Sequence, residues 1–391
     1  MALRCIYSDM RKVRKVILLI ETSRAYGRGV LRGITKYSRM YGPWVFYSEP
    51  GGLEKALPKM RHWGADGIIM RDSGRGSAAL KLGVPIIVSV HLKQHIKGTP
   101  FIDTNGVRIG RMAAEHLLDR GFRHFAFCGF DDLHWSRNRC ENFSKRIAKS
   151  GFETAIYKQP RSRAKRLWEN EQVVMVDWLK SLPKPIGLMA CNDDRARHVS
   201  EACKVAGLHV PEQVAVVGVD NDELVCELSD PPLSSVALNV ERGGYEAAEL
   251  LDKLMARRRA AHKDIIVEPT HVVTRQSTDI MAIEDSETVE ALRFIRQHAK
   301  EPIQVGDVLK AVPLSRRALQ KRFRRVLNRS VHDEIRRVRN EQVVTMLTET
   351  NLSISRIAAD FGYGGIEKLS RYFQREKGLT PLEYRKRYGK K

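Results

Sequence analysis

Two clusters of polar and charged side chains near the C-terminus have the residue types that can recognise nucleic acid. The first cluster consists of Arg316, Arg317, Gln320 and Lys321, and the second consists of Glu367, Lys368, Ser370 and Arg371. Arg hydrogen-bonds to the edge of guanine, Gln to adenine and Glu to cytosine, while other basic side chains suit phosphate oxygens. The chemistry that these clusters support is therefore the readout of base pairs in the DNA major groove.

Each cluster lies on the second helix of a pattern that consists of a short helix, a break and another helix. The first unit spans residues 305–323 with a break at 311–314, and the second spans 354–373 with a break at 362–365. This is the helix-turn-helix pattern, whose second helix enters the major groove. We call these second helices the reading helices.

Apolar residues at helical spacing must position the reading helices. We expect one face of each reading helix to pack inward through Leu319, Phe323 and Val326 in the first unit and Ile366, Leu369 and Phe373 in the second. Gly362 fits the tight turn of the second unit, and Asn328 can end its helix in the left-handed conformation. A linking helix over 331–348, burying Ile335, Val343, Val344 and Leu347, is expected to fix the distance between the units.

The charge of the chain agrees with this chemistry. The 391 residues carry a formal net charge of +22, and from Asp285 onward 24 Lys and Arg stand against 13 Asp and Glu. About half of the excess therefore lies in the region of the two clusters, as is typical of a protein that binds a polyphosphate. The alternative is a basic face that serves solubility alone, and the coincidence of the charge with the reading helices disfavours it.

Several other classes of protein are disfavoured. No run of 18 apolar residues is present, and the apolar run at 16–20 is too short for a signal peptide core, so we expect a cytoplasmic protein without a membrane partner. The cysteines form no C-x-x-C and no Cys/His cluster, so we expect reduced thiols, no metal site and no cofactor. They are Cys5, Cys128, Cys140, Cys191, Cys203 and Cys226.

The larger part of the chain alternates short apolar runs with helical stretches, which predicts α/β lobes built on parallel sheets that are covered on both faces. The expected strands are 16–20, 44–48, 67–70, 84–89, 124–128, 186–190 and 214–219. The expected helices are 29–41, 53–63, 107–120, 137–149, 173–182, 195–206 and 242–256. We assign 1–12 to an N-terminal extension, 13–278 to a two-lobed sensor domain, 279–285 to an acidic linker and 286–391 to the helical domain.

Residues 286–388 resemble the DNA-binding domain of the AraC family. The matching pieces are Ser353-Ile354, Ile357-Ala358, Gly362-Tyr363, Tyr372-Phe373, Gly378-Leu379-Thr380-Pro381 and Tyr384-Arg385. Two departures lie in the linking helix, where Asn340 stands in place of a usual Leu and Val343 in place of a usual Ala. They bear on the packing angle between the two units.

Residues 13–278 resemble the sugar-binding core of LacI-type repressors and periplasmic binding proteins. The matching pieces, in the same order, are 29–34, 103–105, Gly110 with 113–118, Asn192-Asp193, 211–220 and 233–236. A LacI-type core followed by an AraC-type domain is similar to the group of bacterial xylose-operon activators. This resemblance implies a sugar effector, xylose or a related pentose, and double-stranded promoter DNA as partners, with RNA polymerase if the protein activates and a homodimer as its form.

Polar residues that follow the strands of such a core are candidates for ligand contacts. Sugars need carboxylate, amide or guanidinium groups for their hydroxyls and an aromatic surface for their C–H faces. The candidates are Tyr26, Arg28, Trp135, Arg139, Asn192, Asp193 and Asp220. By the resemblance, Arg139 and Asp220 match the arginine and aspartate that LacI-type cores direct at sugar hydroxyls. The alternatives are that Asp193 caps the next helix, that Arg139 pairs locally and that Trp135 belongs to the core.

The mechanism that we expect is closure of the two lobes around the sugar, which repositions the two reading helices on successive major grooves about 34 Å apart. Other readings are a sensor of a different small molecule, an architectural DNA-binding protein, and an enzyme fused to a DNA-binding domain. The enzyme reading has thin support, because the chain has no nucleophile elbow, P-loop or H-E-x-x-H pattern. We therefore expect no catalytic residues.

Overall fold

The computed structural model describes most of the chain. The described residues are 13–48, 63–72, 79, 81–91, 98–162, 166–256, 264–279, 286–327 and 329–389. The expected N-terminal extension, nearly all of the expected helix at 53–63, the linker from residue 280 onward, Asn328 and the side chain of Val326 lie outside them.

The chain divides into two compact units. The first unit, here called the first lobe, contains the described residues of 13–104 and 240–267. The second unit contains a second lobe, residues 105–239 with 268–279, and the C-terminal helical domain, residues 286–389. The chain therefore passes between the units three times, after Thr104, after Asn239 and after Val267.

The first lobe is built on a parallel sheet of six strands in the order β11-β5-β4-β3-β1-β2. The strands are β1 (Arg14–Leu19), β2 (Trp44–Ser48), β3 (Gly67–Arg71), β4 (Ile86–Ser89), β5 (Phe101–Thr104) and β11 (Ile265–Val267). Consecutive residues of β1 are buried, so both faces of this sheet are covered. Helices α1 (Ala25–Tyr41) and α9 (Val240–Met255) approach so closely that a Cβ on Gly33 would lie 2.0 Å from the Glu241 carbonyl oxygen.

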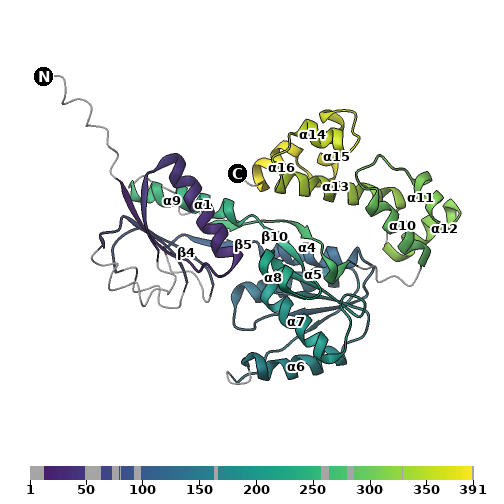
Figure 1. The fold of residues 1–391 in the computed structure, drawn as a ribbon, viewed down its shortest axis with the longest axis horizontal. Coiled ribbons are helices and arrows are strands. Elements are labelled where there is room, and N and C mark those ends of the chain that lie inside the picture. The colour runs from purple at the N-terminus through teal and green to yellow at the C-terminus, as the bar shows by residue number, and fades with distance from the viewer. Residues whose placement is uncertain are drawn as a thin grey trace. The chain divides into compact units, whose positions relative to one another are not determined.

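The second lobe contains a sheet of six strands in the order β12-β10-β9-β8-β6-β7 (Figure 1). The strands are β6 (His124–Cys128), β7 (Thr154–Ile156), β8 (Ile186–Ala190), β9 (Val214–Asp220), β10 (Ser234–Leu238) and β12 (Pro269–Val273). The expectation of a wholly parallel sheet is wrong here, because β12 runs antiparallel to β10. The chain re-enters this lobe at Glu268, beside the end of β10, and has to run back along that strand.

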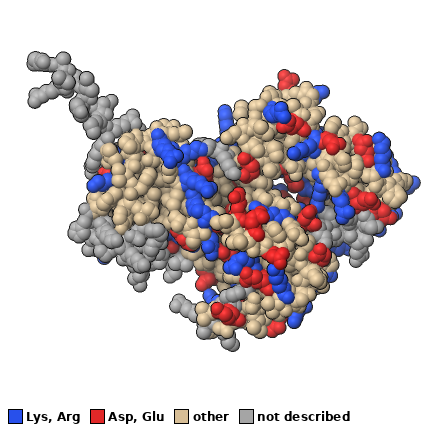
Figure 2. Space-filling view, in the orientation of Figure 1, with Lys and Arg blue, Asp and Glu red and all other residues tan. Residues whose placement is uncertain are grey.

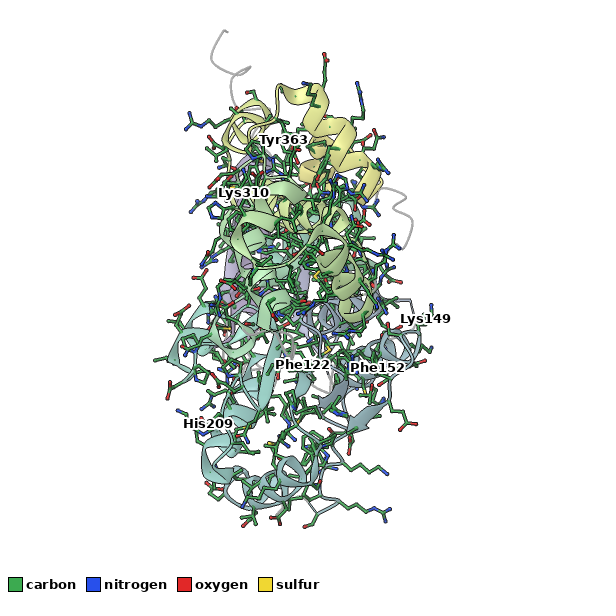
Figure 3. All side chains as sticks on the ribbon, turned by 90° about the vertical axis from the view of Figure 1, so that its right-hand side faces the viewer. Phe122, Lys149, Phe152, His209, Lys310 and Tyr363 are labelled. Carbon is green, nitrogen blue, oxygen red and sulfur yellow. The ribbon has the colours of Figure 1, made fainter. Side chains whose placement is uncertain are left out.

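Helices pack on this second sheet and enclose its core. They are α4 (Gly106–Leu118), α5 (His134–Ala148), α6 (Trp168–Ser181), α7 (Asp193–Ala206) and α8 (Glu223–Leu228), with a 3-10 turn η2 (Gln276–Thr278) after β12. Phe122 and Phe125 are almost fully buried in this core, and the Phe125 ring lies 5.5 Å from that of Phe152 (Figure 3). The expected strands at 124–128 and 186–190 are confirmed with these bounds.

The C-terminal helical domain consists of two groups of helices that share one long helix (Figure 1). Its helices are α10 (Ser286–Gln297), α11 (Val305–Ala311), α12 (Arg316–Leu327), α13 (Val331–Glu349), α14 (Ile354–Asp360), α15 (Ile366–Lys377) and α16 (Pro381–Tyr388). One core gathers apolar side chains from α10–α12 and the first half of α13, and the other gathers those of α14–α16 and the second half of α13. The expected linking helix, with Ile335, Val343, Val344 and Leu347 buried, is confirmed.

Asn340, which stands where the AraC family usually has Leu, is expected to lower the stability of the C-terminal helical domain. Asn340 is 1% exposed, and neither polar atom of its side chain has a hydrogen-bond partner among the described residues. A buried amide without partners costs about 1–3 kcal/mol. We therefore expect Asn340→Leu to stabilise the C-terminal helical domain by about that amount, seen as a higher denaturation midpoint for this domain by calorimetry. An unchanged or lower midpoint would contradict this expectation, and Asn351→Leu, at an exposed position, serves as the control.

Candidate functional site

The first reading helix, α12, presents the predicted residues to solvent. Arg316, Arg317 and Lys321 are exposed and Gln320 is half-buried, while Leu319 and Phe323 are fully buried beneath them. The Ser315 hydroxyl accepts a hydrogen bond from the Ala318 amide at 3.2 Å and so starts the helix. Figure 2 shows basic and acidic side chains together over the part of the domain formed by α11 and α12.

The second reading helix, α15, has the same organisation, and one of its predicted core residues is exposed. Glu367, Lys368 and Arg371 are exposed and Ser370 is half-buried, and Leu369 and Phe373 pack inward as predicted. Ile366, however, is 46% exposed, so the prediction that it packs inward is wrong. It occupies the first position of α15, directly after Gly365, and the helix has not yet reached the core there.

The turn before α15 is fixed by glycine and arginine. Gly362, predicted to fit the tight turn, has φ +65°, a left-handed conformation that glycine adopts without strain. The Arg339 guanidinium of α13 donates to the Phe361 carbonyl oxygen at 2.5 Å and lies 5.1 Å from the centre of the Tyr363 ring. Figure 3 shows Tyr363 in this second helix-turn-helix unit and Lys310 in the first helix-turn-helix unit. The linking helix α13 thus holds the second helix-turn-helix unit through the Arg339 side chain as well as through the apolar core that they share.

A charged pair stands at the carboxyl end of β9 in the second lobe. Arg139, from α5, is 3% exposed and donates to the Asp220 carboxylate at 3.5 Å and to the Cys191 carbonyl oxygen at 2.5 Å. Burial raises the pKa of Asp220 to about 6, although Arg139 acts in the opposite direction. The structure therefore brings together the two residues that the sequence singled out from positions 81 apart.

The backbone at this charged pair is strained. Asp220 has φ +102° and Asn221 has φ +49°, both unusual for residues other than glycine. Two contacts hold the turn: the Ser235 hydroxyl accepts from the Asn221 amide at 3.0 Å, and Arg275 donates to the Asn221 side chain at 2.9 Å. Such local strain is common where a side chain must be aimed at a ligand. Asn221 directly follows the predicted candidate Asp220. Nothing in the sequence near Arg275 indicates that its side chain contacts Asn221.

The other candidates of the second lobe have local roles in the structure. The Asn192 side chain accepts from the Arg195 amide at 3.0 Å and caps α7, so the cap is Asn192 and not Asp193. The Asp193 carboxylate is 2% exposed and accepts from the Asp222 amide at 2.8 Å and the Ser235 hydroxyl at 2.5 Å. Burial and the nearby Asp220 raise its pKa well above the usual range. Asp193 therefore supports the 220–222 turn.

Trp135 packs against Arg139 in this lobe. Its ring lies under the Arg139 guanidinium at 4.9 Å and beside the Phe130 ring at 6.3 Å. Trp135 is partly buried at the edge of the apolar core, so it packs on the core and contacts Arg139 at the same time. The stacking fixes the direction of the guanidinium toward Asp220.

A second polar cluster lies in the first lobe, at the carboxyl ends of β1, β3 and β4. Glu21 pairs with Arg71, and Arg71 contacts the His91 ring at 2.8 Å. Burial and Arg71 lower the pKa of His91 to about 4, which keeps the imidazole neutral. Tyr26 and Arg28 lie half-buried in the first turn of α1, and Arg28 donates to the Thr22 carbonyl oxygen at 3.0 Å. Arg71 and His91 were not among the candidates predicted from the sequence.

The residues that the structure describes contain no group of three His, Cys, Asp or Glu side chains placed to hold a metal ion. None of the helices in the described part of the chain is long and apolar enough to cross a membrane.

Comparisons with known proteins agree with both halves of this arrangement. Residues 114–278 match the periplasmic binding protein-like domain family, and residues 308–387 match a helix-turn-helix domain family. The xylose operon regulatory protein of Escherichia coli K12 is 32% identical over 96% of this chain and 97% of its own length. That of Haemophilus influenzae is 32% identical over 95% of this chain and 98% of its own length.

A solved structure of a xylose-binding transcription activator covers 97% of this chain, with 30% identity, a TM-score of 0.61 and 99% of that chain covered. A LacI family regulator from Enterococcus faecium, solved with bound ribose, is 20% identical over 69% of this chain with a TM-score of 0.56, and so shares the fold of the lobes. The chain belongs to the family of xylose operon regulatory proteins, transcriptional regulators that join a periplasmic-binding-protein-like core to an AraC-type helix-turn-helix domain.

Proposed function

We propose that the protein is a sugar-responsive activator of transcription whose effector is xylose or a related pentose. In this proposal residues 13–278 form the sensor domain, 279–285 the linker and 286–391 the DNA-binding domain. The observation that carries the proposal is the Arg139–Asp220 pair, a buried guanidinium beside a carboxylate on a strained turn at the carboxyl end of β9. A carboxylate and a guanidinium are the groups that bind neighbouring sugar hydroxyls.

The sensor acts by closure of its two lobes. A sugar held by Asp220 and Arg139 in the second lobe, and by Tyr26, Arg28 and the Glu21–Arg71–His91 cluster in the first, binds the closed state more tightly than the open one. This difference in affinity shifts the population toward closure and toward one placement of the C-terminal helical domain. The ribose-bound relative supports a pentose in this fold, and the names of the full-length relatives support xylose.

The DNA partner is a promoter read by α12 and α15 in successive major grooves. As a homodimer the protein would bind two half-sites, and as an activator it would contact RNA polymerase. A sensor of a different small molecule is the second candidate, because a single changed polar residue can switch the preferred epimer. The protein carries no catalytic residues in this proposal.

Calorimetric titration with D-xylose, L-arabinose, D-ribose and D-glucose tests the sensor half. We expect a saturable signal for D-xylose and a weaker or absent one for the others. Absence of binding to all four sugars would remove the sugar-sensor proposal. Turnover of any of them would favour an enzyme.

Arg317→Ala tests the DNA half. Arg317 is exposed on α12 and is the residue type that pairs with guanine, so its loss should cost about 1–3 kcal/mol and relax the preference at one base pair. The measurement is binding of the protein to a set of single-base variants of its selected site. Lys310→Ala is the matched control, because Lys310 is exposed on α11, outside the reading helix. An equal loss of affinity for every site variant would make Arg317 a phosphate contact.

A further inference from the structure

The last helix of the chain is attached to the second lobe through Tyr388. Its hydroxyl accepts a hydrogen bond from Arg108 of α4 at 2.6 Å, and the Arg108 guanidinium lies 4.9 Å from the centre of its ring. Its backbone carbonyl oxygen accepts from the Asn239 side chain at 2.6 Å. Tyr388 and Asn239 are 4% and 6% exposed. We call these interactions of Tyr388 with Arg108 and Asn239 the tail contact.

The tail contact is made at the points where the chain enters and leaves the second lobe. Asn105, Asn239 and Glu268 are the residues of this lobe next to the three passages between the units, and we call them the crossover residues. Asn105 donates to the Glu268 carboxylate at 3.1 Å, and Arg108 donates to the same carboxylate at 3.0 Å while it holds Tyr388. Asn239 is therefore one hydrogen bond from Tyr388, Glu268 is two, and Asn105 is three by way of Glu268 and Arg108.

A separate contact holds the first half of the linking helix α13 to the second lobe. Asp119, at the end of α4, is 8% exposed and pairs with Arg329 and, at 2.8 Å, with Arg337 of α13. Burial alone would raise the pKa of Asp119, but Arg337 and Arg329 lower it, so the pair stays ionised. Arg337 also binds the fully buried Glu334 carboxylate at 2.7 Å. We call this the Asp119 contact; it joins residues that lie entirely within the second unit and away from the crossover residues in sequence.

Helix α4 thus carries the C-terminal helical domain at both of its ends. Asn105 caps α4, Arg108 lies in its first turn, and Asp119 follows its last residue, about 16 Å from Arg108 by the rise of an α-helix. Hinges of two-lobed proteins are the few residues at which the chain crosses between lobes, and these residues absorb the backbone rotation of closure. A rotation at the crossover residues acts on the tail contact, whereas Asp119 lies at the opposite end of α4 from them.

We propose that the tail contact transmits sugar-driven closure to the DNA-binding domain, with the Asp119 contact as its pivot. Closure changes the geometry of Asn239 and Glu268, moves Tyr388 through its two hydrogen bonds, and turns α15 and α16 relative to α12 or turns the whole domain about Asp119. The inference rests on the proposed function, since it needs a ligand that closes the lobes.

The test measures the ratio of DNA affinities with and without saturating D-xylose in the full-length protein. The DNA is a duplex selected by the wild-type protein from a random pool in the presence of D-xylose, and sugar binding is followed by calorimetry in the same samples. The variants are Tyr388→Phe, which removes one hydrogen bond and keeps the ring, Asn239→Ala and Arg108→Gln. Arg111→Gln is the matched control, because Arg111 lies one turn further along α4, is 67% exposed and pairs with Glu115 of the same helix.

We expect each tail-contact variant to bind D-xylose. Its ratio of DNA affinities with and without D-xylose should be about three- to tenfold smaller than that of the wild type, which is the effect of one hydrogen bond. The Arg111→Gln control should keep the ratio of the wild type. If the wild type responds to D-xylose and all three variants respond equally well, the tail contact transmits nothing and the proposed function still stands. If the wild type binds D-xylose without any change in DNA affinity, the proposed function fails, and this inference fails with it.

Discussion

Asp220→Ala is expected to weaken D-xylose binding about 30- to 1000-fold. The substitution removes the carboxylate that accepts sugar hydroxyls and leaves the buried Arg139 guanidinium without its acidic neighbour, a loss of about 2–4 kcal/mol. Calorimetric titration of the full-length protein measures the change. Asp230→Ala is the matched control, because Asp230 lies in the same lobe, pairs with Lys204 and is 82% exposed. An affinity within twofold of the wild type would show that Asp220 does not touch the sugar.

The same carboxylate predicts how sugar affinity depends on pH. Burial raises the pKa of Asp220 to about 6 in the free protein, so a proton occupies it below that pH. Sugar hydroxyls that donate to the carboxylate favour its ionised form, and binding must then displace the proton. Affinity should therefore fall as the pH drops through 6 and level off above it. Asp220→Asn should remove this dependence. A wild-type affinity that stays the same from pH 5 to pH 7 would contradict the assignment.

The interiors of the helices and strands could be predicted from sequence better than the helix starts. The expected strands at 124–128 and 186–190 have the bounds found in the structure, because buried strands are continuous apolar runs between turns. Helices α1 and α5 begin four and three residues before their expected starts. Neither Arg24 nor Leu133 caps its helix with a side chain, so no sequence signal marks these starts. At α7 the cap is present, and the helix begins at Asp193, two residues before its expected start at Arg195.

The candidate site was predictable only where a residue follows a strand or matches a known family. Asp220 ends β9 and Arg139 lies on α5, and the resemblance to LacI-type cores singled out both. Arg275 and Asp119 gave no such signal. Their partners, Asn221 and Arg329, are 54 and 210 positions away, and only the packing of distant elements brings them together. Ile366 shows the reverse, because helical spacing alone cannot tell which turn of a helix first meets the core.

Phe373→Ala is expected to destabilise the second helix-turn-helix unit by about 3–5 kcal/mol and to leave the first one folded. Phe373 is fully buried between α14, α15 and α16, and its ring meets that of Tyr384 edge to face at 5.3 Å. Truncation of a buried Phe leaves a cavity of this cost. The first unit has its own core around Leu319 and Phe323, so the loss should stay local.

The consequence for DNA is a footprint that shrinks from two major grooves to one. Footprinting of the full-length protein on its selected duplex should keep protection at the groove read by α12 and lose it at the groove read by α15. Ile366→Ala is the matched control on the same helix, since Ile366 is 46% exposed and its truncation should change stability by less than about 0.5 kcal/mol. Equal loss of protection in both grooves would mean that α13 makes the two cores one cooperative unit. In that case the two apolar clusters, although separate along α13, would unfold together.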